Sequence, residues 1–141
     1  MSVINNKGFV DTGVTYLQVV ERFPVNVARE GFSSLINVVE KNIIRQGTSD
    51  TFLVNYTLVH TMTYRPVTEC NLKTTVKNYT ISIPLRLTNP PAVGTLPTID
   101  ETTVLGDETF INTCGGCPDG AFNKFVRNVT LEFNVAAAPA A

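Results

Sequence analysis

The residues in this chain best suited to redox chemistry, metal binding or catalysis are three cysteines and a single histidine. Cys114 and Cys117 form a Cys-Gly-Gly-Cys motif that runs straight into Pro118-Asp119-Gly120. A redox dithiol needs a position that opens a helix and lowers the thiolate pKa, whereas Pro-Asp-Gly favours a turn. We therefore expect a loop whose thiols are either free or joined in a disulfide, within one chain or between chains.

A zinc site is the alternative for these side chains. His60, Cys70, Cys114 and Cys117 are the right ligand types, but Cys70 and Cys114 are far apart in the sequence. His60 falls on the apolar face of a predicted strand, which indicates a core or interface histidine, and a dyad with one of the cysteines has no local support. We expect no metal and no cofactor.

Other enzyme signatures are missing from the sequence. It contains no Gly-x-Ser-x-Gly elbow, phosphate-binding loop or His-Glu-x-x-His motif. We therefore expect a protein that is not an enzyme and takes no small-molecule substrate.

The composition favours β structure. Charged residues make up 16%, and the chain has 19 threonines among its 141 residues. Threonine and valine are β-branched and suit a pleated, half-buried surface. The net charge of −1 offers little repulsion against self-association. No stretch of the sequence approaches the 18 apolar residues that would predict a membrane span.

The clearest elements alternate apolar and polar side chains, as half-buried antiparallel strands do. This pattern predicts strands at 14–20, 52–64, 79–87 and 126–135. Pro84 indicates an edge strand or a bulge, because proline has no N–H for a ladder.

One helix is expected, at 28–45. Ala28, Phe32, Leu35, Ile36 and Val39 begin an apolar stripe with helical spacing, and Gly47 is a suitable C-cap residue. The segment 35–39 would also suit a strand. The predicted fold class is α+β, predominantly β: an antiparallel meander sheet with one amphipathic helix.

The chain is short enough for a single domain covering residues 1–141. Residues 1–13 are expected to form an N-terminal arm, 88–124 a long loop region, and 136–141 a flexible tail. Loops of such length are usually functional or lie at interfaces.

If the central strands share one sheet, a row of polar side chains would line its open face. Hydroxyl and amide groups bind RNA bases, 2′-hydroxyls and phosphates, and Arg86 could meet a phosphate. An ordinary solvent-facing sheet has the same pattern. The candidate RNA-binding residues are Thr57, Thr61, Thr80, Ser82, Arg86, Asn128 and Thr130.

A family resemblance rests on three segments. Residues 77–85 form a Lys-Asn-Tyr strand, Asn89-Pro90 and a cysteine-bearing loop follow, and 127–133 form the last strand. This order resembles the coat proteins of single-stranded RNA bacteriophages (the leviviruses), over roughly residues 52–135.

The resemblance implies a homodimer that assembles into an icosahedral shell around viral RNA in the host cytoplasm. It also implies disulfides between subunits, with Cys70, Cys114 and Cys117 as candidates. The family places two clamping helices after its last strand, whereas here the expected helix lies at 28–45. Either that helix takes over the clamping role, or the chain is another virion or filament protein, such as a jelly-roll capsid, decoration or tube subunit without RNA binding.

Overall fold

The structure is a computed structural model that describes residues 2–3, 8–47, 50–112 and 120–135. These residues form eight β-strands and contain no helix. The strands are β1 (Ser2–Val3), β2 (Phe9–Val10), β3 (Thr12–Ala28), β4 (Ser33–Arg45), β5 (Thr51–Tyr64), β6 (Lys73–Arg86), β7 (Ile99–Ile111) and β8 (Ala121–Val135).

The six long strands form two antiparallel layers. One layer has the order β4-β5-β6, and the other has the order β3-β8-β7. The short strand β2 joins them, since it pairs in parallel with β6 through Phe9 and Leu85 and antiparallel with β3 through Val10 and Thr12. β1 pairs with β3. β4 and β7 are therefore the two ends of a continuous sheet order.

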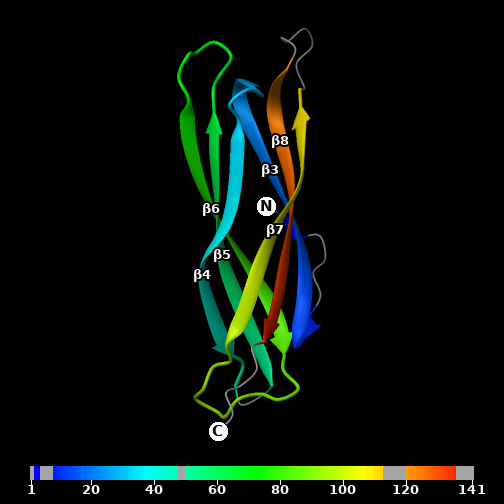
Figure 1. The fold of residues 1–141 in the computed structure, drawn as a ribbon. Coiled ribbons are helices and arrows are strands. Elements are labelled where there is room, and N and C mark those ends of the chain that lie inside the picture. The colour runs from blue at the N-terminus through cyan, green and yellow to red at the C-terminus, as the bar shows by residue number, and fades with distance from the viewer. Residues whose placement is uncertain (1, 4–7, 48–49, 113–119, 136–141) are drawn as a thin grey trace.

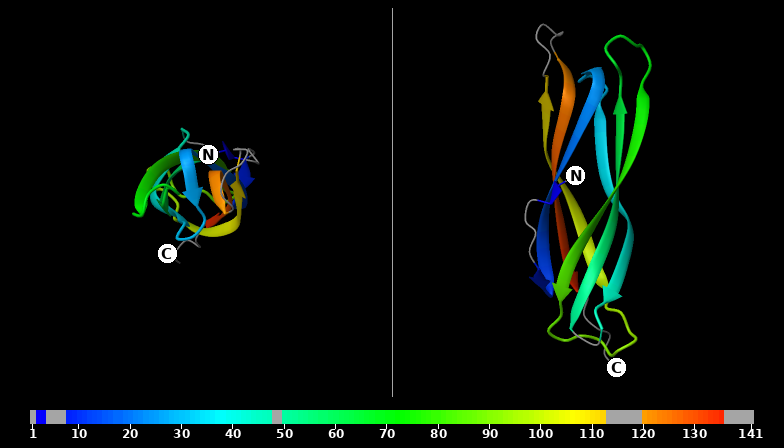
Figure 2. Two further views of the ribbon diagram at one scale, coloured as in Figure 1. Left: turned by 90° about the horizontal axis from the view of Figure 1, so that it is seen from above. Right: turned by 180° about the vertical axis from the view of Figure 1, so that it is seen from behind.

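The layers are long, strongly twisted and wrapped around a shared interior (Figure 1). Viewed along its length, the molecule has a rounded outline with strands on all sides (Figure 2). β4 and β7 approach each other across the open side, where the Lys41 ammonium donates to the Ile99 carbonyl and pairs with Glu101 at 3.0 Å. We call this line of approach between β4 and β7 the seam.

Two apolar clusters fill the interior. The larger one takes inward side chains from both layers, including Leu17, Phe52, Leu58, Leu85 and Leu131. The smaller one lies toward the β5–β6 connection and is built on four residues, Val27, Met62, Phe122 and Phe125. Four further aromatic residues pack on this smaller cluster: Phe23, Phe32, Tyr64 and Phe110.

The predicted helix at 28–45 is wrong, because most of this segment is strand β4, paired along its length with β5. A β-bulge between Val38 and Glu40 explains the misleading spacing. Ile36 and Val38 face the interior before the bulge, and Ile43 does so after it, so the alternation changes phase by one residue. The resulting pattern imitates a helical stripe in a sequence rich in β-branched residues.

Much of the expected loop region 88–124 is also strand. β7 occupies residues 99–111 and pairs with β8, which begins at Ala121 and not at 126. The fold class is therefore predominantly β, as predicted, but the described ranges contain no α component. The tail at 136–141 lies outside the described residues. Part of the expected N-terminal arm joins the sheet as β1, β2 and the first residues of β3.

Candidate functional site: a polar layer between two apolar clusters

Four strands each place one polar side chain between the two apolar clusters. On β5, His60 lies between Leu58 of the larger cluster and Met62 of the smaller one. On β3, Glu21 follows Val19 and precedes Val27 in the same manner. Ser34 on β4 and Arg127 on β8 hold the corresponding positions in their strands. We call this set of side chains, with Lys77 and Tyr79 of β6, the polar layer.

Glu21 is the acceptor at the centre of the layer. Its side chain is 1% exposed, and its carboxylate accepts hydrogen bonds from the Tyr79 hydroxyl and the Lys77 ammonium. The Nδ1 atom of His60 lies 3.3 Å from Oε1 of Glu21. Burial raises the pKa of Glu21, but the hydrogen bonds from His60, Lys77 and Tyr79 and the charge of Lys77 outweigh it and lower that pKa to about 2. Glu21 is therefore a carboxylate at neutral pH.

The pKa of Tyr79 is shifted in the opposite direction. Burial, the hydrogen bond to Glu21 and the nearby negative charge all raise the pKa of the Tyr79 hydroxyl. The hydroxyl therefore stays protonated at any ordinary pH and donates a hydrogen bond to the carboxylate.

His60 connects Glu21 to Ser34. The imidazole is fully buried and stacks on the Phe125 ring at 6.1 Å between centroids. Its Nε2 atom lies 2.6 Å from the Ser34 hydroxyl oxygen. Because the carboxylate can only accept, Nδ1 carries a proton, and in the neutral imidazole Nε2 then accepts from the Ser34 hydroxyl. The three side chains form a series from hydroxyl to imidazole to carboxylate.

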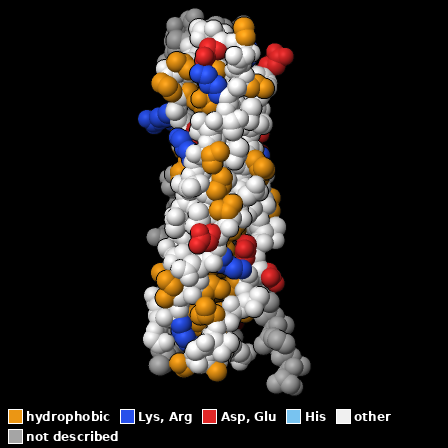
Figure 3. Space-filling model, turned by 90° about the vertical axis from the view of Figure 1, so that its left-hand side faces the viewer, with side chains coloured by type: hydrophobic (Ala, Val, Ile, Leu, Met, Phe, Trp, Pro, Cys, Tyr) orange, Lys and Arg blue, Asp and Glu red, His pale blue; other side chains and the backbone are white. Residues whose placement is uncertain are grey.

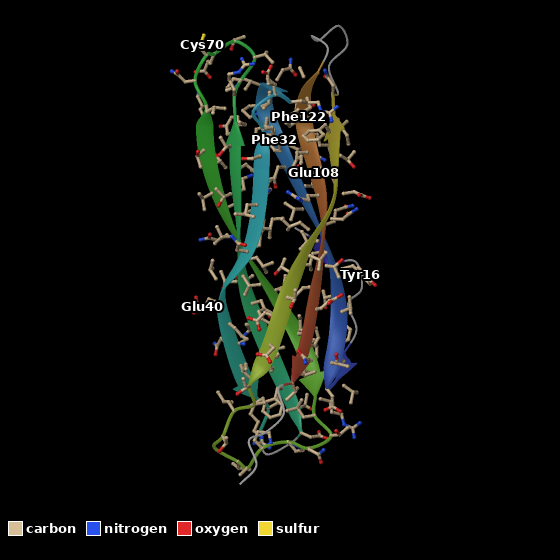
Figure 4. The ribbon with its side chains drawn as sticks, viewed as in Figure 1. Tyr16, Phe32, Glu40, Cys70, Glu108 and Phe122 are labelled. Atoms are coloured by element: carbon tan, nitrogen blue, oxygen red, sulfur yellow. The ribbon has the colours of Figure 1, made fainter. Side chains whose placement is uncertain are left out.

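Arg127 closes the layer at the seam. Its Nη1 atom donates to the Ser34 carbonyl oxygen at 2.5 Å and lies 3.9 Å from the Glu108 carboxylate. Its Nε atom is buried and has no hydrogen-bond partner in the described part of the chain. Figure 4 shows Glu108 on β7, below the aromatic side chains Phe32 and Phe122. A donor left without a partner beside Ser34 could bind an oxygen atom brought to this position.

The candidate RNA-binding residues fall into two groups. Thr57, Thr61, Thr80, Ser82 and Arg86 lie on the outer face of β5 and β6, where Thr57 pairs with Thr80. Asn128 and Thr130 belong to β8 in the other layer. The expected single row therefore does not form, because β8 pairs with β3 and β7 and not with β5 or β6.

Several members of these groups are already engaged. Ser82 donates to the Asn55 side-chain carbonyl at 2.5 Å, and the amide of Gln18 donates to Asn128 at 3.3 Å. The Arg86 guanidinium pairs with the Asp50 carboxylate at 3.0 Å.

Among the cysteines, Cys70 is exposed in the connection between β5 and β6 (Figure 4). Cys114 and Cys117 lie outside the described residues. Within the described ranges, no group of three or more histidine, cysteine and acidic side chains is arranged to hold a metal. His60 is hydrogen-bonded to Ser34 and Glu21.

The sequence contains a signal for the polar layer, which is the presence of polar residues at positions where the alternation predicts apolar ones. Glu21, His60 and Arg127 each interrupt the inward, apolar positions of a strand. A charged or titratable residue rarely occupies such a position unless it has a partner. Three interruptions on three strands therefore indicate buried polar side chains that need partners, without showing which strands supply them.

Comparisons with known proteins found no relative of this chain. No protein-family model, no curated protein and no solved structure matches it. In the part of the chain that the structure describes, no helix has the length and apolar character of a membrane span.

Proposed function

We propose that this protein is a structural subunit that assembles with copies of itself through the outer face of the β4-β5-β6 layer. The observation that carries the proposal is the pattern on this face: two apolar patches separated by a polar band. The register of the three strands aligns these residues in rows across the layer, and the rows succeed one another along its length. Figure 3, which looks onto this side, shows hydrophobic side chains at intervals along the molecule.

The upper patch lies nearer the β5–β6 connection. Leu35 of β4 and Val76 of β6 flank Thr61 of β5 in one row of the register. Leu35 is 52% exposed, Val76 58% and the bulged Val39 58%. Large apolar side chains exposed together on one sheet face are typical of an interaction surface.

The lower patch consists of Ile44, Leu53 and Pro84, which stand in one row across the three strands. Between the patches, Asn42, Asn55 and Ser82 form another row. Hydroxyl and amide groups in this band can form hydrogen bonds with a second copy while the apolar patches meet. A two-fold axis lying in the interface plane would match apolar with apolar and polar with polar.

The face is large enough for such contact. Three strands spaced by ~4.8 Å, each ~13 residues long at ~3.3 Å per residue, cover roughly 600 Å². Two such faces bury about 1,200 Å², at the lower end of stable protein interfaces. The net charge of −1 leaves little repulsion between copies.

The more specific forms of the proposal are a levivirus-like coat subunit that contacts genomic RNA, and a virion or filament component without RNA. The pairing of Arg86 with Asp50 and the presence of Asn128 and Thr130 in the other layer favour the second form. RNA binding depends strongly on cationic groups that reach phosphates, and the candidate set offers Arg86 alone.

Size-exclusion chromatography with light scattering, followed by electron microscopy, tests the proposal. We expect the chain to form dimers or larger assemblies, and the double variant Leu35→Lys with Val76→Lys to shift it toward monomer. Val104→Lys is the matched control, because Val104 is an exposed valine, 47% accessible, on β7 of the other layer. A chain that is monomeric at all concentrations contradicts the proposal, and assemblies with a nucleic-acid absorbance ratio would favour the coat form.

A further inference from the structure

The series of hydrogen bonds from Ser34 through His60 to Glu21 has the order found in nucleophilic serine sites. The hydroxyl oxygen lies 2.6 Å from Nε2, and Nδ1 lies 3.3 Å from the carboxylate. In such sites the carboxylate holds the imidazole in the tautomer whose Nε2 accepts the hydroxyl proton. We propose that Ser34, His60 and Glu21 form a nucleophilic site that reacts with small carboxylic esters carrying an apolar acyl group. The proposal goes beyond self-association and is independent of it.

Glu21 has the charge and the fixed position that the role requires. Its carboxylate stays ionised at neutral pH and is held by Lys77 and Tyr79 as well as His60. A carboxylate fixed in this manner stabilises the imidazolium that forms when His60 takes a proton. His60 itself is fully buried, so water does not compete for its ring nitrogens.

Ser34 lies where the interior meets solvent. It is half-buried on β4, which ends the sheet order at the seam, whereas the two residues behind it are buried. Arg127 reaches the Ser34 carbonyl and keeps a buried Nε–H without a partner in the described ranges. A guanidinium held at the backbone of Ser34 can stabilise the negative oxygen of a tetrahedral intermediate that reaches it.

The surroundings of Ser34 indicate the substrate class. Ser34 pairs with Met62 across β4 and β5. Phe32, two residues before Ser34, packs against Phe122 at 5.0 Å and Phe110 at 5.6 Å between ring centroids. An acyl group that projects toward these side chains meets an apolar surface, which favours short alkyl or aromatic acyl groups.

The reaction balances with an ester and water. The Ser34 oxygen forms a bond to the acyl carbon while its proton passes to Nε2 of His60. The bond from the acyl carbon to the alkoxy oxygen breaks, and the leaving alcohol takes the proton from His60. Water then attacks the acyl-serine through the same base, which releases the carboxylic acid and restores the Ser34 hydroxyl.

Labelling with diisopropyl fluorophosphate tests the site in the full chain. The serine oxygen would form a bond to phosphorus, fluoride would leave, and the proton would pass to His60. Intact mass and peptide mapping should show one adduct, on Ser34, and p-nitrophenyl butyrate should be hydrolysed. Ser33→Ala is the matched control, because Ser33 is the exposed neighbour on β4 and should leave both signals unchanged.

Two variants and one condition decide the outcome. Ser34→Ala should abolish the adduct, and His60→Gln should slow labelling at least ~10²-fold, the usual minimum contribution of a general base. If His60→Gln fails to fold by circular dichroism, wild-type chain in urea replaces it, and the Ser34 adduct should disappear there. No adduct on Ser34 in the folded chain, or an adduct that forms equally in urea, overturns the proposal.

Discussion

His60 on β5 and Glu21 on β3 meet across the two layers, with Nδ1 of the imidazole 3.3 Å from the carboxylate and both side chains shielded from solvent. The contact joins two residues that are 39 positions apart in the sequence. It also fixes how β3 and β5 are aligned across the interior, because each residue lies between the two apolar clusters on its own strand. A slip of one residue in either strand would turn its polar side chain to the outside.

We expect Glu21→Ala to destabilise the fold strongly. The substitution leaves His60, Lys77 and Tyr79 without their shared acceptor, and a buried polar group left without a partner costs about 1–3 kcal/mol. Urea denaturation followed by circular dichroism measures the change in the free energy of unfolding. Glu132→Ala, on an exposed position of β8, is the control and should stay within about 0.5 kcal/mol of wild type. Equal effects of the two substitutions would contradict a structural role for the polar layer.

The stability of the chain should fall at acid pH partly through Glu21. The pKa of this carboxyl is about 2 in the folded chain, against 4.5 ordinarily. The folded state therefore binds fewer protons than the unfolded state, so the contribution is full above about pH 4.5 and is lost as the pH falls toward 2.

The measurement for this acid effect is Tm between pH 6 and pH 2 for wild type and for Glu21→Gln. We expect the wild type to lose more Tm than the variant over this range. Asp11 and Asp50 also have lowered pKa values, through Thr88 and Arg86 respectively, and they titrate in both proteins. Parallel curves would show that Glu21 does not carry the difference.

Gly106 on β7 should resist substitution by alanine. A Cβ atom there would lie 2.9 Å from the backbone oxygen of Asn128 on β8. Because that oxygen belongs to the paired strand, the clash would have to be relieved by moving the β7–β8 ladder, and overpacking of this kind typically costs about 1–3 kcal/mol. Gly8→Ala is the control, since the nearest atoms would be at 3.9 Å. Thermal unfolding of the two variants should separate them clearly.

The cysteines should reveal how copies of the chain meet. Cys70 is exposed, and one thiol per chain can link two chains and no more. In the variant Cys114→Ser with Cys117→Ser, mild oxidation should therefore give a covalent dimer on a non-reducing gel. In the wild type, multiples beyond the dimer would require Cys114 or Cys117. A wild-type gel with a monomer band alone would argue against disulfides between subunits.

The alternation of side chains in the sequence determined most of the fold class. Residues 52–64 alternate almost perfectly, and the structure pairs them as β5 between two antiparallel neighbours. The side-chain period of a strand is two, so the alternation in the sequence shows which side chains of a half-buried strand face the interior. The polar residues Glu21 and His60 at inward positions were equally visible in the sequence, but their contact with each other was not.

Only the tertiary structure decided that residues 33–45 form β4. A local pattern does not distinguish a bulged strand from a helix when the bulge shifts the alternation by one residue. Pairing with β5 over the whole segment is a non-local interaction, and it overrides the local preference. The strand order likewise separated Asn128 from Thr80 and brought Ser34, His60 and Glu21 together. Contacts between distant strands depend on how the layers pack, and no spacing along the chain records that packing.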